Sequence, residues 1–188
     1  MIKLPLFDKI KMSKAFCLLA LGLLCPVSYS APFIANKNYL AMNLNHSDYK
    51  DLITVVESAQ ALKLHSRGES HITVITPPEF EVLSKNVTIQ EINKVAVDSS
   101  MQNSVFEKKC IGEGKKDDLR TYFVVVSAPS LLTIRKSISA LYIKKGGQVK
   151  DFIAEDFLPH ITIGFTQRDL FELDGVVKNV ASCILPLP

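Results

Sequence analysis

The feature that most constrains the fold of this chain is an order of elements, strand then helix then strand, that occurs twice. In the first half, residues 39–45 alternate well enough to form a strand and end at polar turn residues. Apolar residues then recur every three or four positions over residues 52–62, as on one face of an amphipathic helix. Residues 71–76 follow as a β-branched run that ends at two prolines, so the first half is predicted to fold as strand, helix, strand.

The second half repeats this order. Residues 122–126 are a β-branched strand, a turn over residues 127–130 follows, and residues 131–142 carry a second apolar helical face that ends at lysines and glycines. A second β-branched strand covers residues 160–165. Between the two units, a capping box at residues 88–91 predicts a short helix. We expect each repeated unit to form one lobe of the fold, and residues 106–114 and 178–185 are predicted to be the later strands of these two lobes.

Residues 1–30 have the pattern of a secretory signal peptide. Four lysines and one aspartate lie among the first residues, and residues 15–24 carry no charge. Ser28 and Ser30 are the small residues that a signal peptidase reads. We therefore expect cleavage after Ser30 and an exported protein, periplasmic or secreted.

We expect no stable membrane anchor. The uncharged stretch is interrupted by Pro26 and is shorter than the about 20 apolar residues that span a bilayer. A lipid-modified Cys25 is an alternative, although the bulky Leu24 before it does not favour one. Met12 is an alternative start of translation.

The leader also accounts for the formal net charge of +3, so the remaining residues balance basic and acidic side chains. A neutral chain lacks the excess of cations with which proteins neutralise a run of phosphates. We therefore expect no broad nucleic-acid surface. With 47% hydrophobic residues, the rest of the chain can bury a core, and we expect a single domain over residues 31–188 and a monomer.

Two cysteines remain after the leader, Cys110 and Cys183. An even pair in an exported protein can be oxidised, so we predict a disulfide between them that would tie the two lobes together. The alternative is a pair of buried free thiols that pack as small hydrophobic residues.

The residues that can carry chemistry lie in two matching motifs, His71-Ile72-Thr73 and His160-Ile161-Thr162. Each motif lies in the third element, a strand, of one repeated unit. Residues two apart in a strand point to the same face, so each histidine projects together with its threonine. An imidazole titrates near neutral pH and can act as acid or base. The threonine hydroxyls can donate hydrogen bonds to phosphate oxygens without a metal. The pair predicts phosphodiester chemistry, and the sequence does not decide which histidine is the acid.

With these two motifs the chain resembles the 2H (two-histidine) phosphoesterases, a superfamily that includes cyclic phosphodiesterases and the so-called 2′-5′ RNA ligases. The resemblance covers essentially residues 38–185. It implies an α+β fold, bilobal and pseudo-symmetric, with two antiparallel-type sheets around a central cleft and helices on the outside. The approximate lobes are residues 36–115 and 116–188. It also implies that His71 and His160 are catalytic and that Thr73 and Thr162 bind phosphate.

Two features narrow the expected substrate. The export signal is unusual beside the cytoplasmic RNA-processing members, and Gly164-Phe165 stands where that branch has a basic residue. We therefore expect a hydrolase of a 2′,3′-cyclic, ADP-ribose cyclic or 2′-5′ phosphodiester, with a nucleotide or short oligonucleotide as substrate. The alternatives are an exported module that binds a phosphorylated ligand without catalysis and a secreted effector that cleaves RNA.

We expect no metal and no cofactor. Two histidines with hydroxyl companions lack the further carboxylate or thiolate ligands of zinc and iron sites, and no zinc-binding motif occurs in the chain. His46 and His65 lie among polar residues, where a solvated or capping role is expected.

Overall fold

The computed structural model describes residues 31–188, so the predicted signal peptide lies outside the described residues. Within that range, no helix combines the length and the apolar character that a membrane crossing requires. The described elements are, in order, β1 (Leu40–Leu44), α1 (Asp51–Gln60), β2 (Ser70–Ile75), α2 (Pro77–Leu83), α3 (Ile89–Asp98), β3 (Glu107–Lys116), β4 (Leu119–Ser127), α4 (Pro129–Lys144), β5 (His160–Phe165) and β6 (Cys183–Leu185). Short 3₁₀ turns join several of them.

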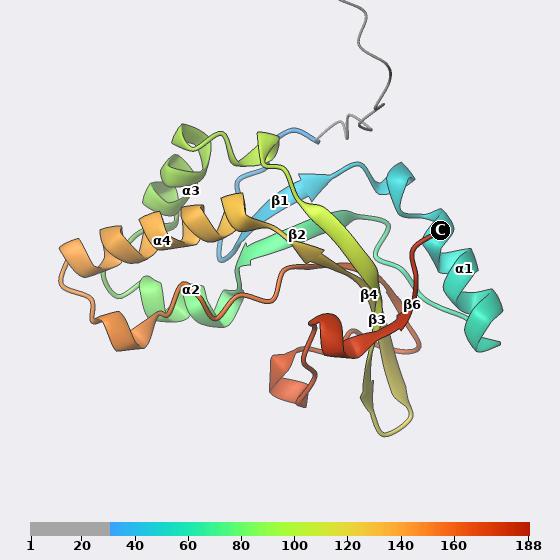
Figure 1. Cartoon of the computed structure of the whole chain (residues 1–188). Helices are drawn as coiled ribbons and strands as arrows, with labels where there is room; N and C mark the ends of the chain where they lie inside the picture. The colour runs from blue at the N-terminus through green and yellow to red at the C-terminus, as the bar shows by residue number, and fades with distance from the viewer. Residues whose placement is uncertain (1–30) are drawn as a thin grey trace, which may run out of the picture.

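The strands form two antiparallel sheets. One contains β1 and β2, and the other has the order β5-β4-β3-β6. β2 and β5, the third elements of the two predicted units, lie next to each other where the sheets meet. Helices α2, α3 and α4 gather at one end of the molecule and α1 lies at the other (Figure 1). The predicted α+β class with two antiparallel sheets is confirmed.

The prediction that the strand at residues 106–114 belongs to the first lobe is wrong. β3 pairs with β4 along its whole length and therefore belongs to the four-stranded sheet, so that within residues 31–188 the other sheet consists of β1 and β2. The physical reason is the short connection, because only Asp117 and Asp118 separate the two strands. Asp117 adopts a left-handed conformation (φ 52°), which aspartate tolerates better than most residues, and a hairpin this tight holds its strands together.

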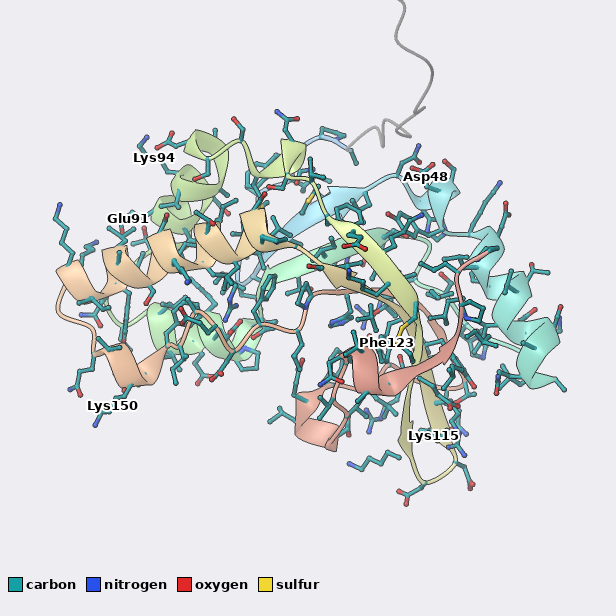
Figure 2. All side chains as sticks on the ribbon, viewed as in Figure 1. Asp48, Glu91, Lys94, Lys115, Phe123 and Lys150 are labelled. Atoms are coloured by element: carbon teal, nitrogen blue, oxygen red, sulfur yellow. A yellow bond between two sulfur atoms is a disulfide. The ribbon has the colours of Figure 1, made fainter. Side chains whose placement is uncertain are left out.

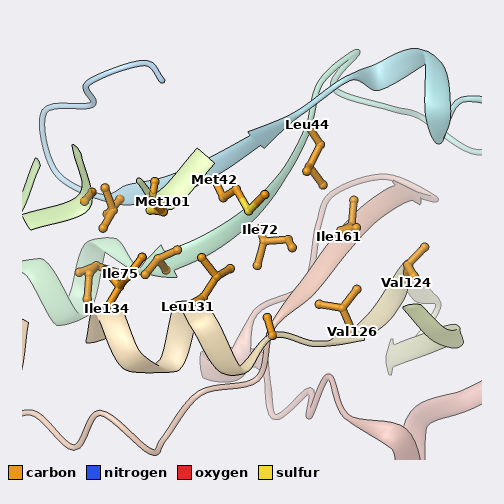
Figure 3. Packing of buried hydrophobic residues seen from close by; sticks show 14 of the residues in the cluster. Met42, Leu44, Ile72, Ile75, Met101, Val124, Val126, Leu131, Ile134 and Ile161 are labelled. Atoms are coloured by element: carbon orange, nitrogen blue, oxygen red, sulfur yellow. The ribbon is translucent and has the colours of Figure 1, made fainter. Parts of the chain in front are cut away.

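One hydrophobic core joins the two sheets. Buried side chains from both sheets and from α4 pack in a single cluster, including Met42, Ile72, Val124, Leu131 and Ile161 (Figure 3). Charged side chains such as Lys94 and Lys150 extend outward into the solvent, whereas Phe123 lies in the interior (Figure 2). The shared core fixes β2 against β5, and the functional residues depend on this contact.

One helix, α2, was not predicted, and another, α4, begins within a predicted turn. α2 begins directly after Thr76, which forms a capping box with Glu79, and the two prolines occupy its first turn, where their missing N–H groups cost nothing. α4 begins at Pro129 rather than after it, for the same reason. The helix predicted from the capping box at Thr88 is present as α3.

The predicted disulfide between Cys110 and Cys183 is present, with a Cα–Cα distance of 5.8 Å. It does not tie two lobes together as expected, because β3 and β6 are neighbours in the same sheet. β6 has only three residues and pairs with β3 at two positions, so the bond fastens the C-terminal segment to the sheet.

Removing this bond should therefore destabilise the protein. We expect the Cys110→Ser/Cys183→Ser variant to lose about 2–5 kcal/mol of unfolding free energy, since the bond closes a loop between residues 73 positions apart. Urea denaturation with and without reductant measures this loss. Reductant should leave the double variant unchanged, and equal midpoints for both proteins in the absence of reductant would contradict the prediction.

Candidate active site

A cavity of about 270 Å³ lies where β2 and β5 are adjacent, and its lining contains His71, Thr73, His160 and Thr162. The structure thus brings together all four residues that the motifs predict. The rest of the lining consists of charged, apolar and hydroxyl side chains: Arg67, Lys178, Asp169, Glu172, Phe171, Leu173, Pro77, Pro78 and Thr76.

Strand alternation places these side chains as expected. In β2, Ile72 and Val74 are fully buried, whereas His71 and Thr73, which alternate with them, are partly exposed to the cavity. β5 repeats the pattern, with Ile161 and Ile163 in the core. Each strand therefore holds its histidine and threonine on one face by burying the residues between them.

The tautomer of His160 is fixed by its two partners. Nδ1 lies 2.8 Å from the carbonyl oxygen of Leu158, which can only accept, so Nδ1 carries the proton. Nε2 lies 3.2 Å from Nζ of Lys178, and an ammonium group only donates, so Nε2 is an unprotonated acceptor. Burial, and next the Lys178 charge, lower the pKa of His160 to about 3. His160 is therefore a neutral imidazole at physiological pH.

His71 has a different environment. Burial lowers its pKa from the ordinary value, but the carboxylate of Glu69 raises it, with Oε1 3.8 Å from Nδ1 of the imidazole. The Arg67 guanidinium opposes protonation of His71, but more weakly than the Glu69 carboxylate favours it. The two histidines of the cavity thus differ in the charge that acts on each most strongly, a carboxylate for His71 and an ammonium group for His160.

A buried group of charges next to His160 was missed by sequence reasoning. Asp169 is 5% exposed, accepts a hydrogen bond from Thr121 Oγ1 at 2.6 Å, and lies 3.0 Å from a guanidinium nitrogen of Arg67. Its Oδ1 is also 3.5 Å from Nζ of Lys178. The only sequence signal was the position of Arg67, four residues before His71, since nothing in the local pattern marks Asp169 or Lys178. The cavity therefore contains two cations, Arg67 and Lys178, even though Gly164-Phe165 stands where the RNA-processing members have a basic residue.

The other two histidines lie outside the cavity. The side chain of His46 forms a hydrogen bond of 3.1 Å with the hydroxyl of Ser70. His65 is exposed and pairs through its main chain with Phe165, which joins the segment before β2 to the end of β5. In residues 31–188, no group of three or more His, Cys, Asp or Glu side chains could hold a metal ion.

The comparisons agree with this geometry. No curated protein and no solved structure matches the chain. The profile of the Swiss Army Knife, 2H phosphoesterase domain matches residues 38–171, a range that contains both motifs and most of the two sheets. Because the match covers more than half of the chain, and both histidine motifs line one cavity, the chain belongs to the 2H phosphoesterase superfamily.

Proposed function

We propose that this phosphoesterase is an exported phosphodiesterase that hydrolyses a 2′,3′-cyclic, ADP-ribose cyclic or 2′-5′ phosphodiester without a metal. One observation carries the proposal: two imidazoles and two threonine hydroxyls line a single small cavity. One imidazole takes a proton from water while the other protonates the departing oxygen. Thr73 and Thr162 donate hydrogen bonds to the non-bridging oxygens of the phosphate.

The size and charge of the cavity support a small substrate. About 270 Å³ suits one nucleotide better than a nucleic-acid strand. Two cations, Arg67 and Lys178, lie in the lining together with the carboxylates of Asp169 and Glu172, so the cavity has little excess positive charge for a chain of phosphates. Phe171 and Leu173 are exposed at its edge and offer an apolar surface to the group that the phosphate carries.

Export is part of the proposal and has separate support. A disulfide between Cys110 and Cys183 persists in oxidising compartments and is rare in the cytosol. The disulfide therefore agrees with the leader pattern of residues 1–30. Cell fractionation of the full chain, followed by N-terminal sequencing, should recover a protein that begins at Ala31.

A hydrolysis screen tests the function. Purified protein is incubated with 2′,3′-cyclic nucleotides, ADP-ribose 1″,2″-cyclic phosphate and 2′-5′ linked dinucleotides, each with EDTA present and with the His71→Ala/His160→Ala variant as the blank. We expect turnover of at least one substrate that the blank lacks. Binding of these compounds without turnover would contradict the proposal and favour a non-catalytic binding module, and cleavage of long RNA alone would favour an RNA-cleaving effector.

A further inference from the structure

A lysine outside both motifs lies against one of the two histidines. Lys178 is 2% exposed, lines the cavity, and has its Nζ 3.2 Å from Nε2 of His160. It lies beyond residues 38–171, the range that the family profile matches. Lysine is almost never fully buried unless it is paired, and two polar groups lie close to this one: Nε2 of His160, and Oδ1 of Asp169 at 3.5 Å.

The ion pair with Asp169 accounts for only part of the position of this lysine. Asp169 already accepts a hydrogen bond from Thr121 and pairs with Arg67 at 3.0 Å, whereas its distance to Lys178 is 3.5 Å. The ammonium group also lies 5.5 Å from the ring centroid of Phe123 and 5.6 Å from that of Phe171, near enough for cation–π attraction. These contacts hold the charge in place, and its shortest polar contact is to His160.

The lysine makes the two histidines unequal. Burial and the Arg67 guanidinium lower the pKa of Lys178 itself, but the carboxylates of Asp169 and Glu172 favour its charged form. A positive charge 3.2 Å from Nε2 of His160 opposes protonation of that partly buried atom. The other titratable groups that act on His160 are Asp169, whose carboxylate favours the proton, and His71, which opposes it when charged. The carboxylates of Glu69 and Asp169 favour the protonated form of His71, whereas burial, which lowers its pKa below the ordinary value, and the Arg67 guanidinium oppose it. An acid must hold a proton before the reaction and a base must lack one. Since a carboxylate is the strongest charge acting on His71 and an ammonium group the strongest acting on His160, the charges favour His71 as acid and His160 as base.

We propose that Lys178 is a third catalytic residue, which keeps His160 unprotonated as the base and donates a hydrogen bond to a non-bridging oxygen of the bound phosphodiester. The inference rests on the hydrolysis proposed above. When the phosphodiester binds, the ammonium group of Lys178 turns from Nε2 of His160 to the non-bridging oxygen, and water attacks phosphorus as its proton passes to the freed Nε2. The bond from phosphorus to the leaving oxygen breaks, and that oxygen takes the proton of His71. The proton on His160 then returns to His71 through solvent, so no further reactant is needed.

The first test is an NMR titration of the imidazole nitrogens, which needs no substrate. In the wild-type protein we expect Nε2 of His160 to stay unprotonated well below the ordinary pKa of about 6.5. Lys178→Met removes the cation that opposes protonation, so the pKa of His160 should rise toward that value. Lys94→Met is the matched control, because Lys94 is exposed and pairs with Asp98 on α3, and it should change nothing. If Lys178→Met does not fold, Lys178→Gln keeps a hydrogen-bond donor without the charge.

An unchanged titration of His160 in these variants would overturn the proposal, whether or not the protein hydrolyses any substrate. Conversely, a shifted titration in a protein without turnover would leave the lysine contact standing and would reject the hydrolysis. The NMR experiment therefore separates the failure of one proposal from the failure of the other.

Kinetics test the roles. On the substrate found in the screen, Lys178→Met should lower kcat/KM by about tenfold or more, raise KM, and move the acidic limb of the pH profile to higher pH. A p-nitrophenyl phosphodiester supplies a leaving group that needs no proton. On it His71→Ala should lose less than about tenfold, whereas His160→Ala should still lose about 10²-fold or more. The reverse pattern for the two histidines would overturn the assignment.

Discussion

His71→Ala and His160→Ala should each lower the turnover of the natural phosphodiester by about 10²-fold to 10⁴-fold, the range for removing a general acid or base. Both imidazoles line the cavity and neither packs in the central hydrophobic cluster, so both variants should fold. The double variant should lose little more than the worse single variant, because acid and base act in one step and their effects are not additive. Steady-state kinetics at saturating substrate measures all three losses.

His65→Ala is the matched control for these variants. It also removes an imidazole, but His65 joins the sheet through main-chain hydrogen bonds that alanine keeps. We expect its turnover to stay within about twofold of wild type, as for an exposed side chain away from the site. Full activity in either His71→Ala or His160→Ala would reject the acid–base mechanism. If circular dichroism shows that an alanine variant is unfolded, the same histidine is replaced by asparagine instead.

The repeated order of strand, helix and strand could be predicted because alternation and helical periodicity are local properties. Sheet membership could not, because it depends on which strands meet in space. The strand at residues 107–116 carries no signal that distinguishes pairing with the first unit from pairing with β4, apart from the short Asp117-Asp118 connection. With β3 in the four-stranded sheet, its pairing with β6 puts the disulfide within that one sheet. α2 had a readable signal, since Thr76 and Glu79 have the spacing of a capping box and prolines suit a first helical turn.

The motif residues of the site could be predicted, whereas its charged neighbours could not. His71 and Thr73 are two apart on one strand, so the sequence alone places them together. Asp169 and Lys178 reach the cavity from a segment that has little regular structure, and their burial arises from contacts with distant residues such as Arg67 and Thr121. This is why sequence reasoning left the acid and the base unassigned.

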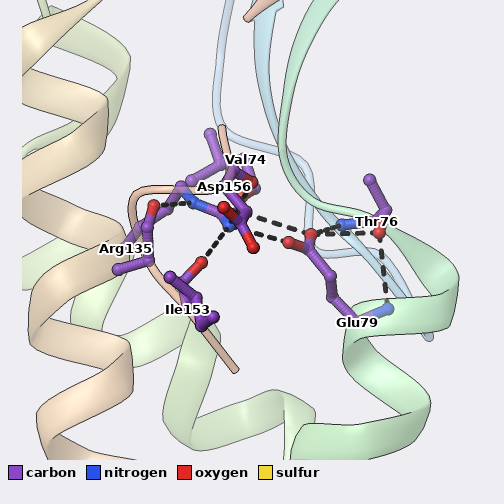
Figure 4. A network of polar contacts seen from close by, with 7 residues as sticks. Val74, Thr76, Glu79, Arg135, Ile153 and Asp156 are labelled. Carbon is purple, nitrogen blue, oxygen red and sulfur yellow. Dashed lines mark hydrogen bonds and ion pairs between the residues drawn. The ribbon is translucent and has the colours of Figure 1, made fainter. Parts of the chain in front are cut away.

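The network around Arg135 should dominate the stability of the cavity wall. Arg135 lies on α4, is 1% exposed, and donates hydrogen bonds to the carbonyl oxygens of Val74 and Ala154 and to both carboxylate oxygens of Glu79 (Figure 4). Its guanidinium also lies 4.9 Å from the ring centroids of Phe152 and Phe157. The residue therefore ties the end of β2 and the start of α2 to the segment that leads into His160.

We expect Arg135→Met to lower the unfolding free energy by about 3–5 kcal/mol, because it leaves a carboxylate and several carbonyl groups without their donor. For a protein of this size that is a fall in Tm of about 6–20 °C, measured by calorimetry. Lys94→Met removes an exposed ion pair instead and should change the free energy by less than about 1 kcal/mol. Arg135→Lys should not restore stability, since one ammonium group cannot replace the planar fork of donors.

A second substitution separates the charge of Glu79 from the carbonyl groups. Glu79→Gln can keep the capping box with Thr76, since glutamine also serves at that position, but it removes the carboxylate charge that Arg135 pairs with. If the unpaired charge causes most of the loss, Arg135→Met/Glu79→Gln should recover part of it. If the unsatisfied carbonyl groups cause it, the double variant should be as unstable as Arg135→Met. Wild-type stability in Arg135→Met itself would show that the segment before His160 is held by its apolar contacts, and that the buried ion pair contributes little.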